Sequence, residues 1–141
     1  MTVKHLVRSI VVCLSLSLGF AGASAALDAK PDAKVTPLIE KPLATTGSAD
    51  KDGVMLLVEY PPGGSTAEHR HNADVFVYVL QGSIVMQVKG GDEVTLQPGE
   101  SFHEAREDIH VVSRNASGTE PAKFVVFLVK DKGAPPVVPV K

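Results

Sequence analysis

The sequence predicts a single all-β domain, built as a sandwich or a barrel. Short runs rich in Val, Leu, Phe and Tyr alternate with turn signals made of Gly, Pro and Asp. This alternation is typical of sandwiches and barrels. No segment beyond the N-terminal apolar run has helical periodicity of useful length. The length of 141 residues allows one ordinary domain.

Composition and charge exclude several classes of protein. With 44% apolar and 21% charged residues, the chain is neither a multi-span membrane protein, a collagen-like fibre nor a wholly disordered chain. Its formal net charge is −2 and no run of basic residues occurs. Because a nucleic-acid backbone requires clustered Lys and Arg, we expect no nucleic-acid partner.

Residues 1–25 have the pattern of a cleavable secretory signal peptide. Lys4 and Arg8 precede a largely apolar run, Ile10–Phe20, which small residues follow as far as Ala25. The run is shorter than the roughly 20 residues that a spanning helix needs. We therefore expect cleavage after Ala25, a periplasmic or secreted location, and no membrane association of the mature chain.

The remaining segments divide the mature chain into a leader, a barrel and a tail. Residues 26–50 are expected to be a leader with at most an edge strand, because Pro37 and Pro42 cannot donate to a strand ladder. Residues 133–141 contain three prolines and are expected to form a loose tail. The β-barrel is expected over 51–132, with strands at Val54–Tyr60, Val75–Leu80, Ser83–Lys89, Glu93–Leu96, Ser101–Glu104, Ile109–Ser113 and Ala122–Lys130.

The strand Val75–Leu80 carries no polar group except the Tyr78 hydroxyl. A strand with one face in water would alternate apolar and polar residues, so both faces of this strand are expected to be covered. The barrel interior covers one face. The other face would contact a second sheet, the N-terminal segment or another subunit, and we expect a homodimer.

Four histidines of the mature chain fall within 42 residues of sequence: His69, His71, His103 and His110. In the segment His69-Arg70-His71, an extended backbone places both imidazoles on the same face, so they could bind one ion. The alternative is a charged surface loop in which these histidines only face water.

The spacing of histidines and glycines resembles the two motifs of the cupin superfamily. The first motif, G-x5-H-x-H-x3,4-E-x6-G, is matched by Gly63, the His69/His71 pair and Gly82. The second, G-x5-P-x-G-x2-H-x3-N, is matched in part by Gly99 and His110. The resemblance covers about residues 57–130 and is strongest to small single-domain bacterial members. It implies a double-stranded β-helix, also called a jelly-roll barrel.

The resemblance also implies a metal site at the mouth of the barrel. His69, His71 and His110 fall on the three histidine ligands of the family. Imidazole suits Fe, Mn, Zn, Ni and Cu to differing degrees, so the expected cofactor is a divalent transition metal. Three protein ligands would leave positions open for water, oxygen or a small-molecule substrate.

The chain departs from the first motif at its acidic ligand. The family's glutamate position falls on Val75 or Phe76. The site would then use three histidines alone, or would add Asp74 or Glu104 as a further ligand or as a residue behind the ligands. Asp74 faces the other side of a regular strand and would need a bulge. The alternative is a degenerate cupin that binds no metal.

The second motif departs at three positions, where Ala105, Glu107 and Arg114 replace its Pro, Gly and Asn. His103 precedes this turn and admits two interpretations. It could act as a general acid or base near the ion, or it could be an exposed histidine at a strand end, paired with Glu104.

Three functions are compatible with this sequence. The first is a metal-dependent enzyme, for which the family implies oxygenase-type chemistry or isomerase or lyase chemistry. The second is a protein that holds a small ligand in the metal pocket without turnover. The third is a structural module with vestigial histidines. The fold hosts many functions and does not choose among them.

Overall fold

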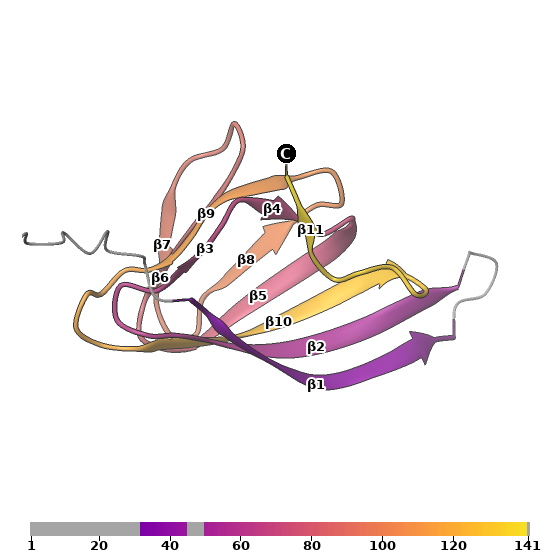
Figure 1. Ribbon diagram of the computed structural model, residues 1–141, viewed down its shortest axis with the longest axis horizontal. Coiled ribbons are helices and arrows are strands. Elements are labelled where there is room, and N and C mark those ends of the chain that lie inside the picture. Colours follow the sequence, from indigo (N-terminus) through magenta and orange to yellow (C-terminus); the bar gives the residue numbers. More distant parts are fainter. Residues whose placement is uncertain (1–31, 45–49, 141) are drawn as a thin grey trace, which may run out of the picture.

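The computed structural model describes residues 32–44 and 50–140, which form two antiparallel sheets packed face to face (Figure 1). The expected signal peptide, residues 1–25, lies outside the described residues. The strands are β1 Lys34–Leu43, β2 Lys51–Tyr60, β3 Ser65–Thr66, β4 His69–Arg70, β5 Ala73–Gln81, β6 Ile84–Val88, β7 Val94–Leu96, β8 Ser101–Glu104, β9 Ile109–Asn115, β10 Ala122–Asp131 and β11 Val138–Pro139.

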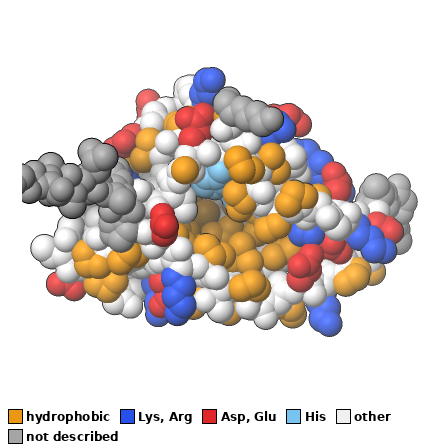
Figure 2. All heavy atoms as spheres, in the orientation of Figure 1, with side chains coloured by type: hydrophobic (Ala, Val, Ile, Leu, Met, Phe, Trp, Pro, Cys, Tyr) orange, Lys and Arg blue, Asp and Glu red, His pale blue; other side chains and the backbone are white. Residues whose placement is uncertain are grey.

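The order of strands within the sheets confirms the all-β prediction. The first sheet has the order β1-β2-β10-β5-β8, and the second has the order β11-β4-β9-β6-β7 with β3 beside β9. Neighbouring strands are mostly distant in sequence, as in a jelly roll. The two sheets enclose the core, and the surface is hollowed between them on the face seen in Figure 2. In the described ranges, no helix is long and apolar enough to cross a membrane.

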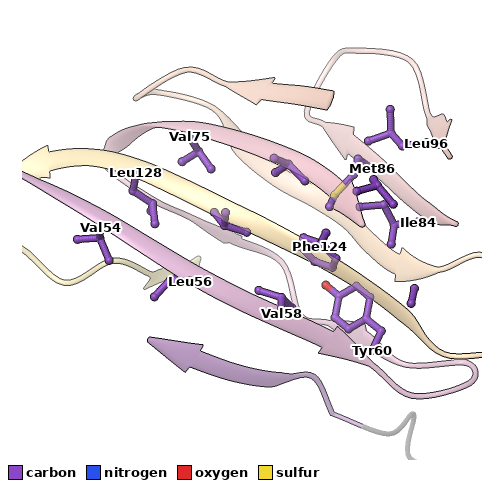
Figure 3. Close-up of a cluster of buried hydrophobic side chains, with 14 of the residues drawn as sticks. Val54, Leu56, Val58, Tyr60, Val75, Ile84, Met86, Leu96, Phe124 and Leu128 are labelled. Atoms are coloured by element: carbon purple, nitrogen blue, oxygen red, sulfur yellow. The ribbon is translucent and has the colours of Figure 1, made fainter. Parts of the chain in front are cut away.

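Alternate residues of the long strands build the core between the sheets. On β5, the side chains of Val75, Val77 and Val79 point inward and are almost fully buried. They pack with Tyr60 from β2 and Phe124 from β10 in one hydrophobic cluster (Figure 3). The alternation of buried and exposed positions along β5 and β10 is the period-2 pattern of strands in a two-sheet fold.

The tight turn between β5 and β6 explains one glycine of the first motif. Gly82 has a φ of +68°, a conformation that side-chain-bearing residues rarely adopt. A Cβ atom at this position would lie 2.5 Å from the carbonyl oxygen of Pro121. Only glycine therefore fits this turn without a shift of the neighbouring loop.

The N-terminal segment is more regular than the expected leader. β1 begins at Lys34, within the expected leader 26–50, and pairs with β2 at the edge of the sheet. The expected edge strand is therefore present. A register shift between Pro37 and Ile39 accommodates the proline, which agrees with the confinement of proline to edges and bulges.

The C-terminal segment is not a loose tail. The backbone nitrogen of Gly133 donates a hydrogen bond of 3.1 Å to the Asp52 carboxylate, which the Lys130 ammonium also contacts at 3.2 Å. The chain then returns across the barrel mouth, where β11 pairs with β4 (Figure 1). Prolines lack a donor, but a short two-residue pairing does not require a full ladder. The expectation of looseness was wrong because these partners are distant in sequence.

The outer face of β5 is exposed in the single chain, although the sequence predicted that it would be covered. Phe76, Tyr78 and Leu80 are 49%, 50% and 46% exposed. Phe127 of the neighbouring β10 lies directly opposite Phe76 and extends the apolar face. The homodimer expected from this strand stays a prediction.

A charge on this face is expected to separate the dimer. The variant Phe76→Glu places a carboxylate at the centre of the expected contact, where it would lose its hydration, so we expect monomers by light scattering. Thr95→Glu, an exposed position on the other sheet, is the matched control and should leave the mass unchanged. A monomeric wild-type chain would contradict the prediction.

Candidate metal centre

Three histidines converge at the barrel mouth. His69 lies on β4 directly opposite His110 on β9, so strand pairing alone brings these two residues together. His71 follows β4, and the next residue, Asn72, has a φ of 48° that turns the chain into β5. One ring nitrogen from each histidine lies within 4.8 Å of the others. The i/i+2 pair and the distant histidine predicted from the sequence therefore share one site.

Hydrogen bonds fix the tautomers of the neighbouring pair. The Nδ1 atom of His69 lies 2.8 Å from the carbonyl oxygen of Ala67, and Nδ1 of His71 lies 2.6 Å from that of Pro136. A carbonyl oxygen only accepts, so both Nδ1 atoms carry the hydrogen. Each neutral ring therefore presents an unprotonated Nε2. Histidine ligands of metals are commonly oriented by such carbonyl acceptors.

The two unprotonated Nε2 atoms face each other at 3.1 Å. Neither has a hydrogen to donate when both rings are neutral, so their lone pairs repel unless a cation lies between them. Two ligands of one ion, each about 2.1 Å from it, lie roughly 3.0–3.4 Å apart. The spacing therefore fits a shared metal ion, and the residues present fit the cofactor that the fold implies.

Burial lowers the pKa of two of the three imidazoles, those of His71 and His110, and keeps them neutral. Desolvation lowers the pKa of His71 to about 4, although the Pro136 carbonyl acts in the opposite direction. Desolvation, with the nearby His69 and His71, lowers the pKa of His110 to about 3. Both ring nitrogens of His110 are buried and have no hydrogen-bond partner within residues 32–44 and 50–140. Neutral imidazole is the form that binds metals, so these rings need no deprotonation near pH 7.

Glu104 is the carboxylate beside two of the three histidines, His71 and His110. Its Oε2 atom lies 3.3 Å from Nδ1 of His110 and 3.6 Å from Nε2 of His71. The residue is only 2% exposed, and desolvation, with a smaller contribution from Asp108, raises its pKa to about 7.

The other two candidate residues lie outside the cluster. Asp74 and His103 are about half exposed on the outer face of the first sheet, where the His103 Nε2 atom lies 3.8 Å from an Asp74 carboxylate oxygen. The His103 ring packs against Phe76 at a centroid distance of 4.9 Å. No bulge turns Asp74 inward, because β5 and β8 pair in regular register from Val75 to Tyr78. His103 contacts Asp74 rather than Glu104.

An apolar pocket adjoins the histidines. Figure 2 shows histidine atoms at the bottom of a hollow that hydrophobic side chains border. The pocket has a cavity volume of about 80 Å³, and its lining includes His69, His71, His110 and Glu104. The apolar part of the lining includes Leu56, Val58, Val77, Met86, Phe124 and Val126.

Three further polar residues of the pocket lining are paired with one another. The Tyr60 hydroxyl lies 2.6 Å from Oγ of Ser113 and 3.1 Å from Oγ1 of Thr66. Because these hydroxyls satisfy one another, the interior offers few free donors or acceptors besides the histidine and glutamate cluster.

The C-terminal segment also contributes to the site, and this contribution was not predicted from the sequence. The Pro136 carbonyl accepts the His71 hydrogen bond, and Val137 lines the pocket. The prolines of this segment suggested an irregular tail. Because every residue type has a backbone carbonyl, the sequence could not single out the carbonyl of Pro136. Three valines, Val137, Val138 and Val140, are the β-forming residues among the last eight positions.

Removal of residues 134–141 is expected to weaken metal binding about 10–100-fold, the range typical of losing an outer partner of a metal ligand. Without the Pro136 carbonyl, the His71 ring loses the acceptor that fixes its tautomer. Competition titration with a chromophoric chelator measures the effect. Val137→Ala keeps every backbone group and should retain wild-type affinity. Equal affinity in the truncated chain would contradict this role.

Fold and site together define a double-stranded β-helix protein with a three-histidine cluster at the barrel mouth. The family model for the cupin domain matches residues 56–128, more than half of the chain. The chain belongs to the cupin domain family.

Comparison with individual solved structures agrees with the fold. A cupin domain from Bordetella pertussis Tohama I is 25% identical, with a TM-score of 0.56 over 72% of this chain and 97% of that chain. KdgF from a Halomonas species is 21% identical, with a TM-score of 0.55 over 71% of this chain and 79% of that one. The DMSP lyase DddQ of Ruegeria pomeroyi is 22% identical, with a TM-score of 0.54 over 61% and 42%.

A curated relative matches a shorter stretch. The tetracenomycin polyketide synthase protein TcmJ of Streptomyces glaucescens is 35% identical over 69 residues, which are 48% of this chain and 44% of that protein. The match therefore spans less than half of the curated relative.

Proposed function

We propose that this chain is an exported cupin that holds one divalent transition metal through His69, His71 and His110 and takes a small, largely apolar molecule into the adjoining pocket. The assignment of a metal ion rests on the Nε2 atoms of His69 and His71, which face each other. Their Nδ1 hydrogens are committed to carbonyl groups, so the 3.1 Å contact between the rings lacks a donor. A metal ion removes this repulsion.

The chemistry of the lining supports the class of ligand. Apolar side chains dominate the pocket, and the paired hydroxyls of Tyr60 and Ser113 offer little to a sugar-like molecule with many hydroxyl groups. We therefore propose an apolar molecule with one oxygen or nitrogen donor directed toward the histidines. When bound, the metal would supply a Lewis-acid centre with open positions.

Export is supported by the composition of residues 1–25, in which a basic start, a short apolar run and small residues follow one another. The mature chain contains no cysteine and would therefore fold in an oxidising compartment without disulfides.

Metal analysis of the full chain, expressed with its own N-terminus and recovered from the periplasm, tests the proposal. We expect about one equivalent of a divalent transition metal per chain. The loaded protein would then be screened for oxygen uptake and for protection against heat by small apolar ligands. Protein that neither contains such a metal nor binds one on titration would overturn the proposal.

A further inference from the structure

The position of the family's acidic ligand can be assigned in this chain. Ten residues separate His71 from Gly82, and the first motif then places its glutamate at position 75. That position is Val75, which is fully buried in the core. An apolar side chain cannot bind the ion, so the position inherited from the motif contributes no charge to the site.

A carboxylate occurs directly across the strand pair. Val75 on β5 lies opposite Glu104 on β8 in the antiparallel register. Directly opposite residues point to the same face of a sheet, with Cβ atoms about 4.5–5.5 Å apart. Glu104 can therefore reach the space that a glutamate at position 75 would reach, but from the neighbouring strand.

One carboxylate oxygen of Glu104 is not paired by any hydrogen bond in the described part of the protein. Its Oε2 atom is buried without a hydrogen-bond partner among the described residues. At 3.6 Å it faces Nε2 of His71, whose hydrogen is on the other ring nitrogen. The second neighbour, Nδ1 of His110, lies 3.3 Å away and also lacks a hydrogen-bond partner. An unpartnered carboxylate oxygen buried among imidazole nitrogens is costly without a cation.

We propose that Glu104 is the fourth protein ligand of the metal, and that it replaces across the β5–β8 pair the glutamate that the first motif has lost at Val75. This inference rests on the proposed three-histidine site. The resulting donor set has three neutral imidazoles and one carboxylate. The bound divalent ion would then carry one positive charge less than in a site of three histidines alone.

Glu104→Gln tests the inference because it keeps the shape of the side chain and removes the charge. We expect metal affinity to fall about 100-fold or more, the upper end of the effect seen when an outer partner is lost. The visible spectrum of the Co²⁺-loaded protein should also change, because its intensity reports the ligand set. Asp74→Asn, one position from Val75 on the outer face, is the matched control and should change neither readout.

A swap across the strand pair tests the same point without leaving a buried gap. Val75→Glu combined with Glu104→Val moves the carboxylate to the motif position, and we expect affinity within about tenfold of wild type, since the two positions share one face. Wild-type affinity and an unchanged Co²⁺ spectrum in Glu104→Gln would overturn the inference. A folded swap variant as weak as the single Glu104→Val variant would also overturn it. Absence of metal binding in the wild-type chain would instead overturn the proposed function.

Discussion

Replacement of His69 and His71 together by alanine is expected to abolish metal binding at the barrel mouth while the barrel stays folded. The variant removes two of the three clustered imidazoles and both of the Nε2 atoms that face each other. We expect affinity to fall by at least about 10³-fold, because loss of even one outer partner of a ligand costs about 10–100-fold. Neither residue belongs to the hydrophobic core cluster.

The measurement is elemental analysis after metal loading, together with far-ultraviolet circular dichroism to verify the β-structure. His103→Ala is the matched control, since this histidine lies on the outer face and contacts Asp74 and Phe76 instead. Its metal content should equal that of wild type. Equal metal content in the paired variant and in wild type would remove the site assignment.

Acidification is expected to destabilise the metal-free protein by roughly 1–2 kcal/mol between pH 6.5 and pH 5, with a slope that rises toward about 1.4 kcal/mol per pH unit at the acid end. The unfolded chain protonates His71 and His110 at their ordinary pKa of 6.5, whereas folding lowers these pKa values to about 4 and about 3. Folding raises the pKa of Glu104 from 4.5 to about 7, which acts in the opposite direction.

The sign of this slope follows from the proton balance. Between pH 4.5 and 6.5 the unfolded chain gains two imidazole protons, and the folded protein holds one carboxyl proton that the unfolded chain has lost. The unfolded state therefore binds about one proton more, and the free energy of unfolding falls as the pH falls. The stability contributed by the histidines is present above pH 6.5 and is lost as the pH falls toward their folded pKa values.

Two variants separate these contributions. His110→Gln removes one histidine, so the slope should become nearly flat. Glu104→Gln removes the opposing carboxyl group, so the slope should roughly double. Urea denaturation in the presence of a chelator, at several pH values, measures all three slopes. The same slope in His110→Gln and in wild type would show that His110 does not remain neutral in the folded protein.

The proposed metal site depends on the arrangement of β4, β8 and β9. β4, β9 and β8 each deliver one group to the barrel mouth, and β11 covers β4 from the C-terminal side. His69 and His110 meet because they are opposite in register. The site is therefore sensitive to strand register, and an insertion in β9 would move His110 away from its partners.

Much of the fold and part of the site could be predicted from the sequence, because both depend on local patterns. Short apolar runs bounded by Gly/Pro turns predicted each central strand, and the positive φ of Gly82 explains why a motif glycine is required there. The i/i+2 spacing of His69 and His71 places two imidazoles on one face of an extended segment. His110 was identified from its spacing to Gly99, and the family model match agrees with that motif.

The rest depended on contacts between segments far apart in the chain. Asp74 and Glu104 were both candidates in the sequence, but strand register turns Asp74 outward and places Glu104 opposite Val75 inside the barrel. The proline-rich end was expected to be loose, yet the Pro136 carbonyl orients His71. Side-chain periodicity within a strand is local and can be read from the sequence. The identity of the opposite residue and the path of a backbone carbonyl are set only by tertiary packing.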